Sequence, residues 1–246
     1  MAYRDWTTPN FSETSRGQSW FCGILPFIEQ QPLSDRINFG ADLNDPGNAA
    51  VSRTPIKTLL CPSDGSNGRG ILDGRANISG ERAVNNYKAC AGSNWEWGTF
   101  SPLAPVTGKW PGSTDGLSRG NGIICRNEDN QRNNYLDFSA VTDGTSNTFA
   151  VGECVPAWCS HSAWYWWNAS TAICAVPINF QRNKGAGFMA QNAGNWPDNY
   201  SFMSQHPAGG QFAYADGHVQ FISNNVDINA YRALATISGG EAASVD

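Results

Sequence analysis

Hydrophobic and polar residues alternate most regularly near the C-terminal end of the chain. Phe212 and Tyr214 precede the pair Asp216-Gly217, and Val219 and Phe221 follow it. Two alternating runs joined by Asp-Gly are the strongest short-range signal for a β-hairpin, and Asp-Gly is typical of a type I′ turn. The pattern therefore predicts two antiparallel strands around this turn.

A helix is predicted directly after the hairpin. Asp227 is a residue type that caps helix N-termini, and apolar residues recur with helical spacing from Ile228 to Thr236. Gly239 lies just beyond, where helices often end. Residues 204–241 are therefore interpreted as a hairpin followed by a terminal helix.

A second helical pattern occupies residues 18–37. Trp20, Ile24 and Ile28 belong to a stripe of apolar residues with helical spacing, and Pro26 falls inside it. Proline ends one helical turn and favours the start of another, because it lacks the backbone N–H. The segment is predicted to be a broken helix.

The remaining pattern favours short strands and long loops. Residues 65–122 are dominated by Gly, Ser, Pro and Asn and are interpreted as a large loop-rich insertion. Residues 148–153 are rich in β-branched and aromatic side chains, which suits a central strand. The other predicted strands are residues 58–64, 83–91, 122–125 and 135–138. Together these elements predict an α+β, β-rich fold in which residues 1–246 form a single domain.

The composition narrows the classes of function. Charged residues are 15% of the chain, below the ~25% usual for globular domains. The net charge is −5, and no run of Lys or Arg is interleaved with the aromatic residues, so nucleic-acid binding is excluded. No stretch approaches the ~18 to 20 apolar residues of a membrane span.

The cysteines suggest an oxidising environment. The chain has seven of them, which is many for a cytosolic protein of this size. Their scattered positions favour disulfides over a zinc site, and the odd count leaves at least one thiol without a partner. Zinc stays open as an alternative at Cys154 and Cys159 with His161 nearby, although such a site would need distant ligands.

Four collinear blocks resemble one protein family. The blocks are LPFIEQQ at 25–31, IKTLLCPSD at 56–64, TDGTSNT at 142–148 followed by Gly152-Glu153, and 206–241, where nine residues separate His206 from Asp216-Gly217. They resemble the DUF1559 proteins of planctomycetes and related bacteria, which carry an H-X9-DG element near the end of the chain.

The resemblance implies a fold and a location. Members normally begin with a prepilin cleavage motif and a long hydrophobic helix, and neither is found in this sequence. The resemblance therefore implies the head of a pilin-like or pseudopilin-like protein with an antiparallel sheet and a truncated N-terminal helix. It also implies a cell-surface or extracellular location, with the full-length protein anchored in the membrane before assembly.

The last block contains a candidate for chemistry. His206 could serve as a general base or metal ligand with Asp216 as its partner, because one loop and one strand separate the two residues. However, the turn itself requires Asp-Gly, and His-Pro suits a loop that enters a strand. A structural role is therefore favoured over catalysis.

The other motif residues do not form a recognisable catalytic set. They are Cys61, Asp143, Gly144, Glu153 and Gly217. If Glu153 is buried, its carboxylate needs a cation or several donors. The three histidines form no recognisable triad, and no Gly-x-Ser-x-Gly, phosphate-binding loop or His-Glu-x-x-His motif occurs. The sequence predicts a protein that is not an enzyme and has no cofactor.

A polar stretch resembles a calcium loop only loosely. Asn127, Asp129, Gln131 and Asn133 place oxygen atoms at alternate positions, without the glycine and final acidic residue of an EF-hand. A solvated loop is the favoured interpretation. If calcium binds here, Asp129 and Asp137 are the first candidate ligands.

The stretch from Trp158 to Trp167 is rich in aromatic residues. On a strand, Trp164 and Trp166 would share one face, and Trp167 would lie on the other, so at least one face should be buried. Core packing is the default interpretation. An exposed pair could instead stack on sugar rings or pack against a neighbouring subunit.

The sequence therefore supports two hypotheses about function. The leading one is a non-catalytic extracellular head domain that assembles with like subunits into a filament or pseudopilus. The alternative is a cell-surface polysaccharide-binding module that uses Trp158, Trp164, Trp166 and Trp167.

Overall fold

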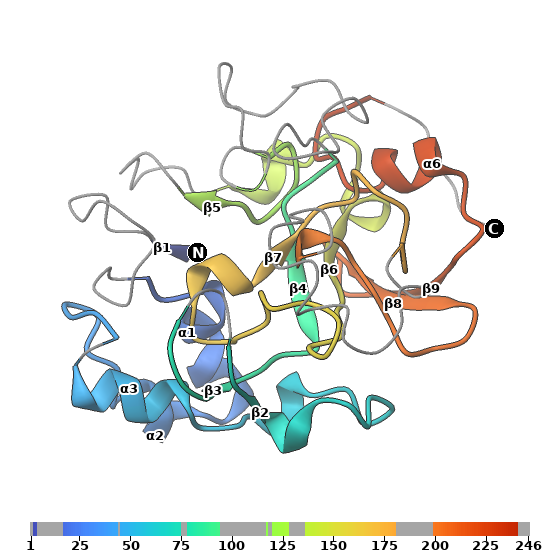
Figure 1. Cartoon of the computed structure of the whole chain (residues 1–246). Coiled ribbons are helices and arrows are strands. Elements are labelled where there is room, and N and C mark those ends of the chain that lie inside the picture. The colour runs from blue at the N-terminus through green and yellow to red at the C-terminus, as the bar shows by residue number, and fades with distance from the viewer. Residues whose placement is uncertain are drawn as a thin grey trace.

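The centre of the molecule is a five-stranded sheet (Figure 1). The computed structural model describes residues 2–3, 17–43, 45–74, 78–93, 117, 120–127, 136–180 and 199–240. The strand order is β7-β4-β6-β8-β9. The strands are β4 (Tyr87–Cys90), β6 (Phe149–Glu153), β7 (Thr171–Ala172), β8 (Gly209–Tyr214) and β9 (Val219–Ser223).

The sheet is mixed. Strand β4 runs parallel to β7, whereas the other neighbouring pairs are antiparallel. Parallel neighbours require a crossover connection, and here a long stretch of chain that includes β6 separates β4 from β7. The prediction of an antiparallel sheet is therefore wrong at this edge, while the α+β class is confirmed.

Two short strand pairs lie outside the main sheet. Strand β1 (Ala2–Tyr3) is parallel to β5 (Arg126–Asn127). Strand β2 (Ile71–Leu72) is antiparallel to β3 (Arg82–Ala83). The second pair and β4 belong to the segment 65–122, so the described part of the predicted insertion contains strands as well as loops.

The N-terminal helical segment is broken, as predicted. It consists of α1 (Trp20–Ile24), η1 (Leu25–Ile28) and α2 (Gln31–Ser34). Pro26 lies in the first turn of η1, where a missing N–H costs no helical hydrogen bond. The helix α3 (Pro46–Ser52) follows and is capped by the Asp45 side chain.

Several predicted strands are 3₁₀ helices, turns or bends instead. For residues 58–64, where the sequence predicts a strand that runs into a turn, the structure has the end of η2 in place of the strand, and the turn is confirmed at Pro62 and Ser63. Residues 122–124 form bends before β5. The described part of 135–138 is a loop that enters η5, and 83–91 is split into β3 and β4. The 3₁₀ helices are η2 (Lys57–Leu59), η3 (Gly68–Gly70), η5 (Phe138–Ala140), η6 (Thr145–Asn147) and η7 (Trp167–Ala169). A short apolar run indicates burial, but it does not specify pairing with another strand.

The C-terminal hairpin is confirmed, with a different turn. The Gly217 N–H donates to the Tyr214 carbonyl at 3.0 Å, and the Tyr214 N–H donates to the His218 carbonyl at 2.9 Å. Gly217 has a φ of 92°, whereas Asp216 does not have a positive φ. This is a three-residue loop with a glycine bulge rather than the predicted type I′ turn.

The predicted terminal helix is confirmed as α6 (Ile228–Ala233). The Asp227 carboxylate accepts from the N–H groups of Asn229 and Ala230 at 2.9 and 3.0 Å. The ring of Tyr231 lies edge-on to that of Phe212, with centroids 5.8 Å apart. The helix is thereby packed against the hairpin.

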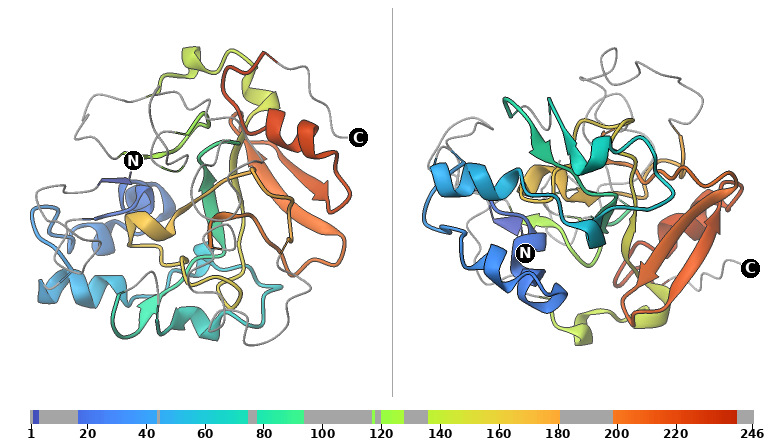
Figure 2. Two further views of the ribbon diagram at one scale, coloured as in Figure 1. Left: turned by 45° about the horizontal axis from the view of Figure 1, so that its top comes forward. Right: turned by 90° about the horizontal axis from the view of Figure 1, so that it is seen from below.

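The buried core has two large clusters. One joins the N-terminal helices to the Trp-rich segment, and the other lies beneath β8, β9 and α6. In both views of Figure 2, helices α1 to α3 lie on one side of the molecule and the β8–β9 hairpin on the other. Strand β6 lies between β4 and β8 in the sheet and contributes Phe149, whose ring centroid is 4.4 Å from that of Phe212.

The seven cysteines are free thiols, so the prediction of disulfides is wrong. The Sγ atoms of Cys90 and Cys174 are 4.0 Å apart, about twice the length of a disulfide bond of ~2.05 Å. Six of the seven are buried. Five of these six act as small apolar residues in the core clusters, a role that a count of cysteines does not reveal: Cys22, Cys90, Cys154, Cys159 and Cys174.

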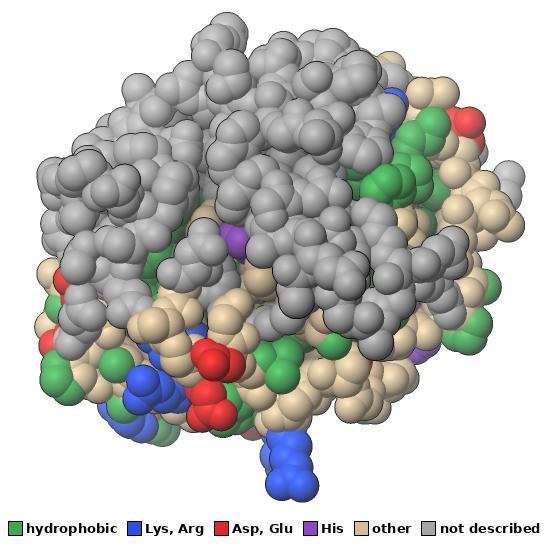
Figure 3. Space-filling model, in the orientation of Figure 1, with side chains coloured by type: hydrophobic (Ala, Val, Ile, Leu, Met, Phe, Trp, Pro, Cys, Tyr) green, Lys and Arg blue, Asp and Glu red, His purple; other side chains and the backbone are tan. Residues whose placement is uncertain are grey.

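Charged side chains of both signs lie on the surface, and the described helices are short. Figure 3 shows acidic and basic side chains close together near the lower edge of one face, in keeping with the small net charge. Among the described residues, no helix has the length and apolar character needed to cross a membrane.

Substitution of Gly209 by alanine should destabilise the hairpin. A Cβ atom at this position would lie 1.9 Å from the carbonyl oxygen of Ile222, which is backbone and cannot rotate away. We expect the free energy of unfolding, measured with urea, to fall by about 1–3 kcal/mol. Gly65→Ala is the control, because its Cβ would meet nothing within 4 Å. Equal stability of the two variants would contradict the close packing of β8 on β9.

Candidate functional site

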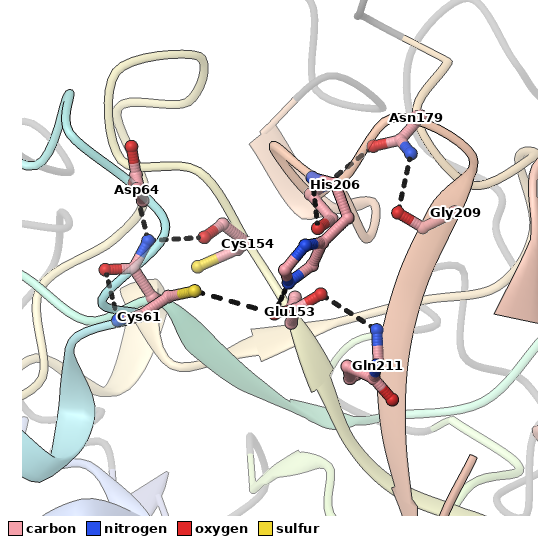
Figure 4. A network of polar contacts seen from close by, with 10 residues as sticks. Cys61, Asp64, Glu153, Cys154, Asn179, His206, Gly209 and Gln211 are labelled. Atoms are coloured by element: carbon pink, nitrogen blue, oxygen red, sulfur yellow. Dashed lines mark hydrogen bonds and ion pairs between the residues drawn. The ribbon is translucent and has the colours of Figure 1, made fainter. Parts of the chain in front are cut away.

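Three side chains with metal-binding atoms meet at the end of the central strand (Figure 4). The Cys61 Sγ lies 3.8 Å from Glu153 Oε1, and His206 Nε2 lies 3.5 Å from the same oxygen. The three ligand atoms all lie within 4.8 Å of one another. Cys61 and Glu153 are buried, and His206 is partly exposed. We refer to Cys61, Glu153 and His206 as the CEH cluster.

The sheet fixes the position of Glu153. It is the last residue of β6 and lies opposite Tyr87 of β4. On the other side, the Gln211 N–H of β8 donates to Glu153 Oε2 at 2.8 Å. One carboxylate oxygen is therefore held by the sheet, while Oε1 faces Cys61 and His206 (Figure 4).

The buried side chain of Asn86 fixes the position of Cys61. Its Oδ1 accepts from the Cys61 N–H at 3.1 Å. Its Nδ2 donates to the Cys154 carbonyl at 3.0 Å and to Asp64 Oδ2 at 2.6 Å. One amide thus links the turn after η2 to the residue that follows Glu153.

His206 lies on the loop that enters β8. Its N–H donates to the Ser204 hydroxyl at 3.1 Å. Asn179 holds both ends of this loop, because its Oδ1 accepts from the Ser204 N–H at 2.6 Å and its Nδ2 donates to the Gly209 carbonyl at 3.4 Å. The His206 side chain is 31% exposed, so the cluster reaches the surface through this residue.

Burial dominates the electrostatics around the cluster. Burial, together with the nearby Cys61 and Glu153, raises the pKa of Tyr87 to about 12. Burial also raises the pKa of the Cys154 thiol well above its usual value. Both groups therefore stay protonated near neutral pH.

The comparison with protein families identifies the chain. Over residues 3–229 it matches the model of a family described as "Protein of unknown function (DUF1559)". The chain belongs to the DUF1559 family. No curated protein and no solved structure matches it.

Three of the four DUF1559 blocks contribute to the CEH cluster. Cys61 comes from the second block, Glu153 from the third and His206 from the fourth. The sequence singled out each of these residues, but it did not indicate that they meet. Asn86 and Asn179, which position the cluster, were missed because an asparagine between short strands carries no distinctive pattern.

Asp143, another residue of the third DUF1559 block, has a different role. Its carboxylate accepts from the N–H groups of Gly239 and Gly240 at 2.7 and 2.9 Å, and from the Thr236 hydroxyl at 3.0 Å. The adjacent Gly144 has a φ of 94°, a conformation that favours glycine. Asp143 therefore fastens the turn before β6 to the segment after α6.

His206 and Asp216 are not partners. They lie at opposite ends of β8, a strand of six residues that spans about 20 Å. His206 contacts Glu153, whereas Asp216 Oδ1 lies 2.7 Å from His218 Nδ1. The alternative of a His206–Asp216 pair, which the sequence did not favour, is therefore not found, because the strand holds its two ends apart. The backbone N–H of His218 lowers the pKa of the exposed Asp216 carboxyl.

The Trp-rich segment belongs to the core of this DUF1559 chain. Trp164, Trp166 and Trp167 are at most 1% exposed, and only Trp158 is partly exposed. The segment forms turns and η7 instead of a strand, so the side chains do not alternate between two faces. The favoured interpretation, core packing, is confirmed for these three rings, which are therefore not available to stack on a sugar.

The calcium prediction is outside what the structure can test. Asp129 lies outside the described residues. Asp137 is exposed at the start of η5, and its side chain does not cap that helix.

Substitution of Asn86 by alanine should destabilise the fold around the CEH cluster. The change leaves the Cys61 N–H, the Cys154 carbonyl and Asp64 without the bonds that the amide provides. We expect a loss of about 2–4 kcal/mol in the free energy of unfolding in urea, since buried polar groups are costly when unpaired. The exposed Asn225→Ala is the matched control and should change stability by less than about 0.5 kcal/mol. A similar small change for Asn86→Ala would show that the amide does not hold the site.

Proposed function

We propose that this DUF1559 chain is the non-catalytic head of a structural subunit, pilin-like or pseudopilin-like, that assembles with copies of itself at the cell surface. As the resemblance to prepilin-type proteins implies, the full-length protein would be anchored in the membrane before it assembles. The observation that carries the proposal is the open edge of β9.

Strand β9 lies at the edge of the sheet. In an antiparallel hairpin, residues alternate between pairs that exchange hydrogen bonds and pairs that do not. Tyr214 bonds to His218 across the turn, so the residues whose backbone points away from β8 are Val219, Phe221 and Ser223. Their N–H and C=O groups form a row that another strand can pair with.

The side chains along this edge are apolar and exposed. Val219 is 62% exposed and Phe221 is 42% exposed. Proteins usually protect edge strands with charges, proline or bulges, whereas β9 has the sequence VQFIS, without a charge or a proline. A strand that is neither charged nor blocked favours pairing with a second strand.

A second copy of the same strand is a suitable partner. Two identical edges can pair antiparallel about a two-fold axis, so that each contributes the same residues. Because β9 has no charge, the copies do not repel one another along the seam. The pairing would cover Val219 and Phe221 in both copies.

The roles of the family residues support a non-catalytic protein. Asp143 fastens two chain segments, and Asp216 closes the turn of the hairpin by accepting from the His218 N–H at 3.0 Å. Both carboxylates serve the fold. Their function is to hold the sheet and its edge in place.

Positive charges on the exposed edge of β9 should weaken self-association of the chain. We expect the double variant Val219→Lys with Phe221→Lys to raise the dissociation constant at least tenfold, equivalent to about 1.4 kcal/mol. Sedimentation velocity over a range of protein concentrations measures this change.

Phe138→Lys is the matched control, because Phe138 is 69% exposed on η5 and does not belong to the hairpin. It should associate like the unmodified chain. A chain that stays monomeric at high concentration, or a double variant that associates as well as the control, would contradict the proposed role of β9.

A further inference from the structure

We propose that the CEH cluster is a zinc site, with Cys61 Sγ, Glu153 and His206 as the three protein ligands. The proposal concerns the end of β6 and does not depend on how the chain assembles. It rests on the distances between the ligand atoms, on the burial of Glu153 and on the combination of ligand types.

Two of the three distances between the ligand atoms are close to those of a tetrahedral zinc site. Zinc binds sulfur at ~2.3 Å and nitrogen or oxygen at ~2.0–2.1 Å, which separates sulfur from oxygen by about 3.5 Å and nitrogen from oxygen by about 3.3 Å. The corresponding distances in the CEH cluster are 3.8 Å and 3.5 Å. A shift of a few tenths of an ångström brings both pairs into range. The third pair, Cys61 Sγ and His206 Nε2, lies within 4.8 Å and has to approach to about 3.5 Å.

The ligand residues differ in how easily they can move. Glu153 is held by the sheet and provides the fixed point. His206 lies on a partly exposed loop and can move toward the other two ligands. The hydrogen bonds of Asn86 and Ser204 hold the backbone N–H groups of Cys61 and His206 in place.

The burial of Glu153 points to a cation. Only 5% of this residue is exposed, and a buried carboxylate is costly unless it is paired. Glu153 accepts from the Gln211 N–H and contacts the other two residues of the CEH cluster. Lys88 on the neighbouring strand donates to the Asn199 carbonyl at 2.6 Å and to Cys159 Sγ at 3.4 Å, so its ammonium group is engaged elsewhere. A bound dication would compensate the charge of Glu153 directly.

The ligand combination favours zinc over calcium and magnesium. Thiolate, imidazole and carboxylate are the three protein ligands that zinc uses, whereas calcium and magnesium prefer oxygen alone. On binding, Cys61 loses its thiol proton to water. The thiolate and the carboxylate then neutralise the charge of the ion, and three protein ligands leave a fourth position for water.

Calorimetric titration of the chelator-treated chain with zinc chloride tests the proposal. We expect one zinc ion per chain, and we expect His206→Gln to weaken binding at least tenfold. His206 is the first choice for substitution, because it lies on a partly exposed loop and its loss should leave the fold intact. His218→Gln is the matched control, because this histidine lies at the far end of β8 and should not affect binding. Equal zinc affinity for His206→Gln and the unmodified chain would overturn the assignment, and so would the absence of binding.

Cobalt substitution identifies the sulfur ligand independently of affinity. Cobalt(II) in the site should produce a thiolate-to-metal absorption band that is lost in Cys61→Ser and kept in Cys154→Ser. Circular dichroism of both variants verifies that they are folded. A band that persists in folded Cys61→Ser, or disappears only in Cys154→Ser, would show that a different cysteine binds the metal.

Discussion

The structure depends on the pairing of β6 with strands on both of its sides. Strand β4 pairs with one edge of β6 and β8 with the other, so the end of β6 is fixed by two ladders of hydrogen bonds. Glu153 lies at that end. Strand β4 is preceded by Asn86, and β8 is preceded by the loop with His206. The pairing of three strands therefore determines which side chains surround the carboxylate.

This arrangement places polar groups where burial is costly. Asn86, Asp64 and Glu153 are each at most 5% exposed, and each is engaged by hydrogen bonds with neighbouring segments. Such a network is stabilising when its members are satisfied and costly when one is missing. The same carboxylate is one of the three side chains of the CEH cluster, so the stability of this region and the geometry of the cluster depend on the same contacts.

Local signals in the sequence predicted the local elements. The Asp216-Gly217 turn, the cap at Asp227 and the proline at position 26 each act within a few residues, and the hairpin, α6 and the broken helix followed from them. The partner of His206 could not be predicted in this way, because Glu153 is distant in the sequence and is brought near by strand pairing. The same limit applies to the cysteines and the tryptophans, whose environments depend on tertiary packing.

Diffraction from a crystal grown with zinc, collected at the zinc absorption edge, is the most direct test of the proposed zinc site. The account predicts one anomalous peak at about 2.0–2.3 Å from Cys61 Sγ, a Glu153 oxygen and a His206 nitrogen. A peak elsewhere, or a map in which these three side chains point away from one another, would contradict it.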